Sequence, residues 1–193
     1  MSGLRRKSKN QNIGNLIIGL SSLFFVILLF PLIKAYLFPT QYNVPKNSAG
    51  IPTGSVIVIP KLDIEAPIIE DVDPFNATEY RLALKKGVAQ AKGTSFPGEG
   101  KKAFLFAHSS DYPWRAGNYN TVFFRLKDLK LGDEIIIYKD LTPLNYRVNE
   151  TKIVWPSDVS YLTEEHDQNV LIIQTCWPVG TSFRRLLVFA SPL

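Results

Sequence analysis

An uncharged apolar segment near the N-terminus restricts this chain more than any other feature. From Ile13 to Ile33 the sequence has no charged residue. A helix of that length would be about 30 Å long, which matches the hydrocarbon core of a bilayer. The segment is longer than the apolar region of a cleaved signal peptide, and "KAYLFPT" after it offers no small-x-small cleavage site. The sequence therefore predicts an uncleaved signal anchor that crosses a membrane.

The charges on either side of this segment predict its orientation. Only Lys34 follows the segment closely, whereas several basic residues precede it: Arg5, Arg6, Lys7 and Lys9. Positive charge is concentrated on the cytoplasmic side of membrane proteins. We therefore expect a single-pass protein of the cell membrane with a cytoplasmic N-terminus and with everything after the anchor outside the cell.

Composition and texture divide the chain into four predicted parts. A basic cytoplasmic tail at 1–12 and the anchor at 13–33 precede a proline-containing linker at 34–54 and a folded domain at 55–193. The formal net charge is +5, but the N-terminal cluster accounts for most of it. The remainder is nearly neutral and shows no nucleic-acid-binding motif, so no nucleic-acid partner is expected.

The folded domain is predicted to be mainly β, with small helices. Short β-prone runs are separated by Gly, Pro and Asp, and "SVIVIPKLDIEAPII" contains two of them, interrupted by Pro60. "TVFFRLKDL" is compatible with a strand or a short helical turn. A short helix is expected over 77–85, with Gly87 as its C-terminal cap. The other predicted strands are "KAFLFAH", "DEIIIYK", "LNYRVNETKIV", "NVLIIQTC" and "RLLVFAS".

Three residues at the ends of predicted strands carry reactive or charged groups. Cys176 closes one apolar run, His108 closes another, and Arg185 opens the last one. A thiol can act as a nucleophile when an imidazole serves as its base or ion-pair partner. A guanidinium can stabilise the oxyanion that forms when a thiolate attacks an amide carbonyl. Together the three would supply a nucleophile, an acid/base group and an oxyanion stabiliser.

Less specific interpretations of the same residues remain open at this point. A lone cysteine is often a small core residue, and a lone histidine is often a surface residue. A metal site built from His108, His166 and Cys176 would lack the closely spaced ligand pairs typical of such sites, so neither a metal nor a cofactor is expected. Arg184 and Arg185 are adjacent and face opposite sides of a strand, and periodicity does not say which one faces Cys176.

Several motifs resemble those of sortases, the membrane-anchored cysteine transpeptidases of bacterial surfaces. The sequence has an apolar strand ending in Thr-Cys, "LIIQTC", then "WPVGTSF", then Arg and an apolar strand, "RRLLVFA". Its histidine follows an apolar strand in "FLFAHSS", although Ala107 stands where the family usually has glycine. The resemblance extends from about residue 55 to 191. It also includes "IPKLDIEAPI", "GTSFPGEGKKAFLFAH" and "FFRLKDLKLGDEIIIY".

The resemblance implies a closed eight-stranded β-barrel with a few short helices, and it implies roles for the three residues. Cys176 would be the nucleophile and His108 its acid/base partner. Arg185, nine positions after Cys176 as in several sortase groups, would stabilise the oxyanion, with Arg184 as the alternative. The loops at 155–168 and 177–183 would flank the substrate groove.

The resemblance further implies a reaction and its partners. The protein would cleave an LPXTG-like sorting signal between Thr and Gly, hold the acyl group on Cys176, and pass it to a cell-surface amine. Its partners would be surface proteins with a C-terminal sorting signal, and an acceptor on the cell wall or on another protein. No long apolar segment follows Phe189, and "DPF" at 73–75 is expected in a loop rather than a lid, which disfavours the pilus-building group. The alternatives are a membrane-tethered cysteine endopeptidase and a non-catalytic β-barrel binding module.

Overall fold

The computed structural model describes residues 9–37, 42–110, 119–164 and 168–193, and the chain forms two compact units, residues 1–38 and 39–193. The first unit contains helix α1 (Lys9–Leu37). Within it, Gln11–Phe30 has a mean hydropathy of 2.4 and none of it is buried, so the helix is long and apolar enough to cross a membrane. Most of the predicted basic tail lies outside the described residues, and none of its four basic side chains is described.

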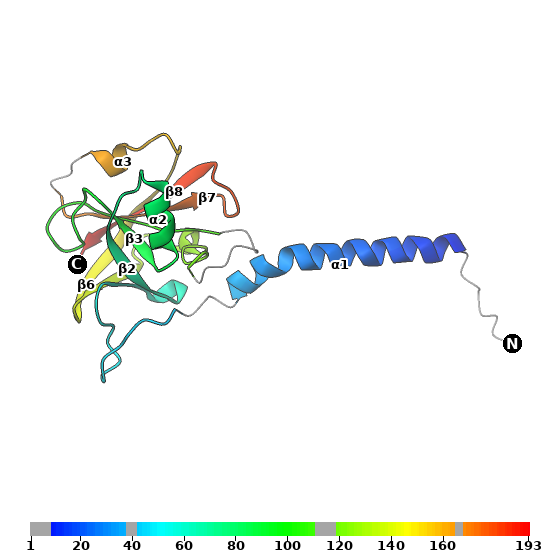
Figure 1. Cartoon of the computed structure of the whole chain (residues 1–193), viewed down its shortest axis with the longest axis horizontal. Helices are drawn as coiled ribbons and strands as arrows, with labels where there is room; N and C mark the ends of the chain where they lie inside the picture. Colours follow the sequence, from blue (N-terminus) through cyan, green and yellow to red (C-terminus); the bar gives the residue numbers. More distant parts are fainter. Residues whose placement is uncertain (1–8, 38–41, 111–118, 165–167) are drawn as a thin grey trace. The chain divides into compact units, whose positions relative to one another are not determined.

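The second unit is a closed β-barrel of eight strands, as predicted. Around the barrel the strands follow the order β1-β2-β3-β4-β7-β8-β6-β5, and pairing of β1 with β5 closes it. Figure 1 labels β2, β3, β6, β7 and β8. The strands are β1 (Val56–Ile59), β2 (Ile64–Val72), β3 (Val88–Ala91), β4 (Ala103–Phe106), β5 (Glu134–Lys139), β6 (Thr142–Val154), β7 (Leu171–Trp177) and β8 (Arg184–Pro192). The helical turns between them are η1 (Pro60–Leu62), α2 (Ala77–Leu84), η2 (Leu126–Asp128) and α3 (Ser160–Thr163).

Two strand pairs in the barrel are parallel, and one of them determines where the functional residues meet. β2 pairs with β3, and β4 pairs with β7, in parallel, while all other neighbours are antiparallel. Parallel strands end at the same edge of a sheet. The residues that follow β4 and the last residues of β7 therefore lie at one edge of the barrel.

The strand pattern predicted from sequence is largely confirmed, with one omission. β3 was not predicted, because Val88–Ala91 is only four residues long and includes Gln90. All four residues of β3 are buried, as are all four of β4. In "TVFFRLKDL" the helical-turn alternative is correct, because this segment forms turns that end in η2.

The predicted capping role of Gly87 is wrong. Helix α2 ends at Leu84, Lys85 occupies its C-cap with right-handed backbone geometry, and the N–H groups of Lys86 and Gly87 both donate to the carbonyl of Ala83. Gly87 is required for a different reason. A Cβ atom at this position would lie 2.2 Å from the carbonyl oxygen of Pro67, so only glycine allows the backbone to approach β2 this closely.

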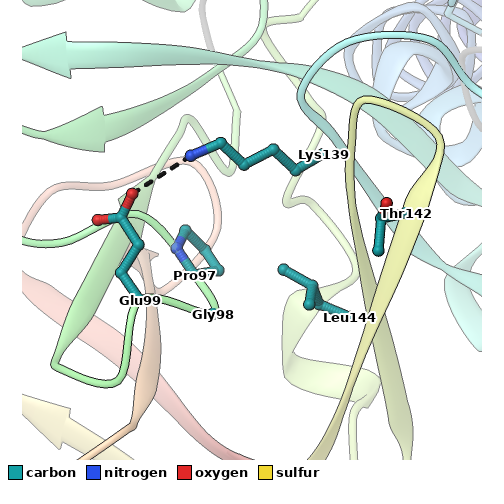
Figure 2. A pocket seen from close by; sticks show the side chains of 6 residues that line it. All are labelled: Pro97, Gly98, Glu99, Lys139, Thr142 and Leu144. Carbon is teal, nitrogen blue, oxygen red and sulfur yellow. Dashed lines mark hydrogen bonds and ion pairs between the residues drawn. The ribbon is translucent and has the colours of Figure 1, made fainter.

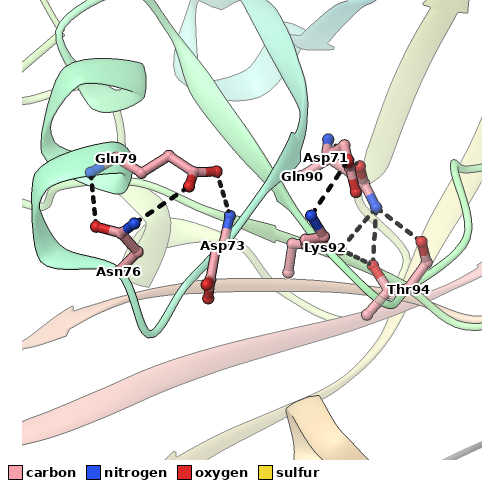
Figure 3. Close-up of polar contacts among 8 residues, drawn as sticks. Asp71, Asp73, Asn76, Glu79, Gln90, Lys92 and Thr94 are labelled. Atoms are coloured by element: carbon pink, nitrogen blue, oxygen red, sulfur yellow. Dashed lines mark hydrogen bonds and ion pairs between the residues drawn. The ribbon is translucent and has the colours of Figure 1, made fainter.

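The segment that joins β2 to β3 is held by side-chain hydrogen bonds (Figure 3). Asn76 caps α2 by accepting from the N–H groups of Thr78 and Glu79, and the Glu79 carboxylate accepts from the N–H of Asp73 at 2.8 Å. Residues 73–75, the "DPF" sequence, form a turn before the helix, as expected for a loop. The buried side chain of Gln90 accepts from the N–H of Asp71 where the β2–β3 register shifts.

Candidate active site

Cys176 and Arg185 lie directly opposite one another on neighbouring strands. The antiparallel register of β7 and β8 pairs Cys176 with Arg185 and Trp177 with Arg184. Directly opposed residues of an antiparallel pair have side chains on the same face, with Cβ atoms about 4.5–5.5 Å apart. Arg185 therefore shares a face of the sheet with the only thiol of the chain. Arg184 lies on the other face.

His108 reaches the same position along the sheet from the other side of β7. The parallel register of β4 and β7 aligns Phe106 with Gln174. Two residues further along each chain are His108 and Cys176, so both occupy the same level and the same face if the alignment continues. Both side chains are partly buried, which leaves them protected but accessible from one side.

Hydrogen bonds show that the alignment continues past the end of β4. The N–H of Ala107 donates to the carbonyl of Gln174 at 3.2 Å, and the hydroxyl of Thr175 donates to the carbonyl of Ala107 at 2.9 Å. Thr175 is buried and faces away from the thiol, as predicted for the residue before it. The carbonyl of His108 in turn accepts from the N–H of Phe123 at 3.0 Å. The backbone that carries the imidazole is thus fixed on both sides.

The three residues singled out from sequence consequently form a row across β4, β7 and β8. Neighbouring strands lie about 4.8 Å apart, so His108, Cys176 and Arg185 are attached to backbone positions spread over about 10 Å. Cys176 occupies the middle. An imidazole on one side of a thiol and a guanidinium on the other form a suitable arrangement for nucleophilic attack on a carbonyl.

The guanidinium of Arg184 is occupied elsewhere. Its central carbon lies 3.0 Å from the ring centroid of Trp155, in a cation–π contact. Trp155 follows the end of β6 and is 58% exposed. This stack keeps Arg184 on the face opposite Cys176.

The loop between β7 and β8 is closed around the guanidinium of Arg185. Nη1 of Arg185 donates to the carbonyl of Ser182 and to that of Arg184, each at 3.1 Å. The N–H of Gly180 donates to the hydroxyl of Ser110 at 2.8 Å. Ser110 follows His108 by two residues, so this bond joins the histidine loop to the arginine loop.

The segment between β6 and β7 contacts the same outer face of the sheet. Tyr161, in α3, packs edge-to-face on Phe189 with ring centroids 5.8 Å apart. Phe189 lies on the same face of β8 as Arg185, because four residues separate them. The predicted flanking loop at 155–168 is therefore seen up to residue 164. Residues 165–167 of this loop, which include His166, lie outside the described residues.

Comparisons with known proteins agree with this fold. Residues 57–193 match the Sortase domain family. The chain belongs to the sortase family. The resemblance noted in the sequence is thereby confirmed, and the family match covers the barrel except for Val56, the first residue of β1.

This sortase is similar to relatives from several bacteria. It is 30% identical to sortase D of Bacillus subtilis (strain 168) over 149 residues, which cover 76% of this chain and 66% of that protein, just under two thirds of its length. Among solved structures, sortase C-1 from Actinomyces oris is 27% identical, with a TM-score of 0.60 and coverage of 85% of this chain and 82% of the other. Sortase A from Corynebacterium diphtheriae, a lid mutant, is 25% identical, with a TM-score of 0.60 and coverage of 82% and 76%.

A surface cavity of this sortase, about 260 Å³ in volume, lies away from the row (Figure 2). It lies beside the β5–β6 turn at the start of β6, whereas Val154, which pairs with Arg185, is at the other end of that strand. The hydrogen bond from the Phe96 N–H and the Lys139 ammonium at 3.2 Å hold the pKa of Glu99 below its ordinary value. The lining residues are Pro97, Gly98, Glu99, Lys139, Thr142 and Leu144.

Metal ligands were not expected in this sortase. Within residues 9–37, 42–110, 119–164 and 168–193 no group of three or more His, Cys, Asp or Glu side chains could hold a metal ion. His166, which the sequence placed in a polar loop, falls outside these ranges.

Some residues that organise this site were not singled out in the sequence. Gly180 adopts a φ of +85°, and the glycine in "PVGT" was a visible signal for such a turn. No sequence signal indicates that Ser110 would accept a hydrogen bond from it, because that contact spans 70 positions. The stacking of Arg184 on Trp155 likewise depends on how β6 and β8 pair.

Proposed function

We propose that this protein is a sortase-type cysteine transpeptidase that cleaves an LPXTG-like sorting signal between Thr and Gly and transfers the acyl group to a cell-surface amine. The observation that supports this best is the row of His108, Cys176 and Arg185 on one face of three adjacent strands. An extended peptide is the substrate that suits such a row, because its carbonyl can lie over the middle position while its ends follow the sheet.

In the first step, the sulfur of Cys176 attacks the carbonyl carbon of the threonine in the sorting signal. The ordinary pKa of a cysteine thiol is about 8.5, so a neighbouring imidazole is needed to take the proton or to pair with the thiolate. The attack forms the C–S bond and places negative charge on the carbonyl oxygen, where donors of Arg185 stabilise it. The C–N bond then breaks, and the glycine nitrogen leaves with a proton from His108.

In the second step, an amine takes the acyl group from the thioester. The amine nitrogen attacks the thioester carbon, His108 accepts the proton that the nitrogen loses, and the C–S bond breaks to restore Cys176. If water attacks instead, the product is a free carboxylate and the enzyme is an endopeptidase. The two outcomes share the first step and differ only in the acceptor.

We infer that α1 anchors the protein in the cell membrane as a single span, with the N-terminus in the cytoplasm and the barrel outside. The apolar helix and the basic residues that precede it in the sequence support this orientation. The partners would be surface proteins that carry a C-terminal sorting signal, and an acceptor amine on the cell wall or on another protein. Protease added to intact protoplasts should digest the barrel; a barrel left untouched would contradict the orientation.

The chemical proposal is tested by mass spectrometry of the full-length protein in detergent, mixed with a library of sorting-signal peptides. We expect an acyl adduct on Cys176 and, after addition of an amine, a ligated peptide. Cys176→Ala should keep the melting temperature within about 2 °C and should form neither product, because the side chain is at a strand end. Transfer by Cys176→Ala would refute the proposal. Product that is only hydrolysed, at every amine concentration, would favour the endopeptidase, and the absence of any adduct would favour a binding module.

A further inference from the structure

Lys102 is a buried lysine next to the strand that leads to His108. Lys102 is only 5% exposed, although lysine is almost never fully buried unless its charge is paired. It comes directly before β4. Lys102 lies an even number of residues before Phe104, Phe106 and His108, so all four belong to one face of that strand.

The ammonium group of Lys102 binds the segment between β6 and β7. Nζ donates to the carbonyl of Leu162 at 2.8 Å and to the carbonyl of Glu164. Leu162 belongs to α3, and Glu164 follows its end. Carbonyls at the C-terminal end of a helix have no partner within the helix, so a cation is a suitable donor for them.

This contact is distant in sequence and close in space. Lys102 and Glu164 are 62 positions apart, and they are brought together because β4 and β7 are parallel neighbours. Leu162 packs against the core, and Tyr161 packs on Phe189, so α3 lies flat on the outer face of the sheet. The ammonium adds charge-assisted hydrogen bonds beneath it, which are stronger than those between neutral groups.

The segment lies on the face that carries the row, but toward its other end. Lys102 precedes His108 by six residues, which corresponds to about 20 Å along an extended strand. That is the length of about six residues of an extended peptide. A peptide whose cleaved bond lies over Cys176 and which runs along β4 and β7 would meet α3 at its distal end.

We propose that Lys102 is a positioning residue that fixes α3 and residue 164 as one wall of the peptide-binding groove. The proposal rests on the proposed function, because it assigns this wall to the same substrate. Lys102 touches neither the reacting carbonyl nor the thiol. It acts through the segment that it holds, and its effect is on peptide binding rather than on the chemical steps.

The test compares Lys102→Met with Lys101→Met in the full-length protein in detergent. Methionine keeps most of the apolar length of the side chain and removes the charge. Lys101 is the exposed neighbour, so its substitution controls for loss of one positive charge nearby. The concentration of folded enzyme is taken from the thermal unfolding curve of each variant, so that unfolded protein is not counted.

For Lys102→Met we expect KM for a sorting peptide to rise about 10-fold while kcat per folded molecule changes less than 2-fold. Backbone amides at 160–164 should exchange hydrogen at least 10-fold faster, and Lys101→Met should match the unaltered protein in both measurements. A purely stabilising role would lower the fraction of folded protein without separating KM from kcat. An unchanged KM, or unchanged exchange at 160–164, would overturn the proposal.

Two further outcomes keep the test decisive. If Lys102→Met does not fold, Lys102→Gln removes the charge and shortens the side chain but keeps a polar end. Faster exchange at 160–164 together with a raised KM in that variant supports the proposal, and unchanged values in both overturn it. If the unaltered protein is not acylated by any sorting peptide and turns none over, the proposed function fails. The assignment of α3 as a wall of a peptide-binding groove then fails with it. Hydrogen exchange at 160–164 then reports separately whether Lys102 holds the segment.

Discussion

Replacing each of the two adjacent arginines by alanine should affect different properties of the protein. Arg185 is paired with Cys176 across β7 and β8, whereas Arg184 is paired with Trp177 and stacks on Trp155. We predict that Arg185→Ala lowers kcat/KM by at least about 100-fold. We predict that Arg184→Ala lowers it by less than about 10-fold and mainly reduces stability.

The magnitudes follow from the contacts of each side chain. Nη1 of Arg185 uses its two N–H groups on the carbonyls of Ser182 and Arg184, so the donors on Nε and Nη2 are those that can serve the substrate. Losing a charged donor to an oxyanion costs about 3–4 kcal/mol, or about 10²–10³ in rate. Losing an exposed cation–π contact costs only about 0.5–1 kcal/mol, which is about 1–4 °C in melting temperature for a domain of this size.

The assay measures kcat/KM of both variants on one fluorescent sorting peptide in the presence of an amine. Thermal melting is followed in parallel, so that activity is compared only between folded proteins. Arg185→Lys serves as the conservative control. It keeps the charge but loses the planar set of donors, so it should recover only part of the rate.

Two results would contradict this reasoning. The first is the opposite ordering, with Arg184→Ala inactive and Arg185→Ala active, because it would mean that the cross-strand register does not decide which arginine serves the thiol. The second is full recovery of activity by Arg185→Lys. That result would mean that Arg185 acts through its positive charge alone and that the several donors of its guanidinium are not required.

Three further predictions concern residues away from the row. Ser110→Ala removes the acceptor of the Gly180 N–H, a hydrogen bond of about 1 kcal/mol, so kcat/KM should fall about 5-fold. Ser110→Thr keeps the hydroxyl and should retain the original kcat/KM. Equal loss in both variants would argue against the hydrogen bond. Gly87→Ala places a Cβ against the carbonyl of Pro67 and should lower the free energy of unfolding by about 1–3 kcal/mol, measured by urea denaturation. An unchanged midpoint of the urea transition would show that the backbone adjusts freely. Glu99 has a lowered pKa in the folded state, so it stabilises the protein above its ordinary pKa of 4.5 and this contribution is lost as pH falls. Glu99→Gln should therefore be less stable than the unaltered protein at pH 7 and equally stable in acid, and a difference that persists at low pH would refute this.

Much of the barrel could be predicted because its strands contain short β-prone runs separated by turn residues. A strand that is covered on both faces has a continuous apolar run in its sequence, and β4 and β7 both contain such a run, bounded by turn residues. The positions of His108 and Cys176 at the ends of these runs were also visible in the sequence. The N-terminal helix could be predicted for a related reason, since an uncharged segment of that length has few stable surroundings other than a bilayer.

Other elements depend on partners that are distant in the chain. β3 is too short and too mixed in composition to be predicted, and it is a strand because β2 and β4 lie on either side of it. Gly87 was assigned to a helix cap from its local position, but the carbonyl of Pro67 on β2 is what excludes a side chain there. The burial of Lys102 beneath α3 has no local signal either.

The sequence by itself determined that a thiol, an imidazole and an arginine lie at strand ends, and only the tertiary structure decided how they meet. Alternation along β8 puts Arg184 and Arg185 on opposite faces, and this follows from the backbone alone. Which of those faces carries Cys176 depends on the register between β7 and β8, and a shift of one residue would exchange the two arginines. That register is set by long-range pairing and by the packing of both strands in the closed barrel, where Ile173 pairs with Val188 and both are buried; a one-residue shift would move one of them to the outer face.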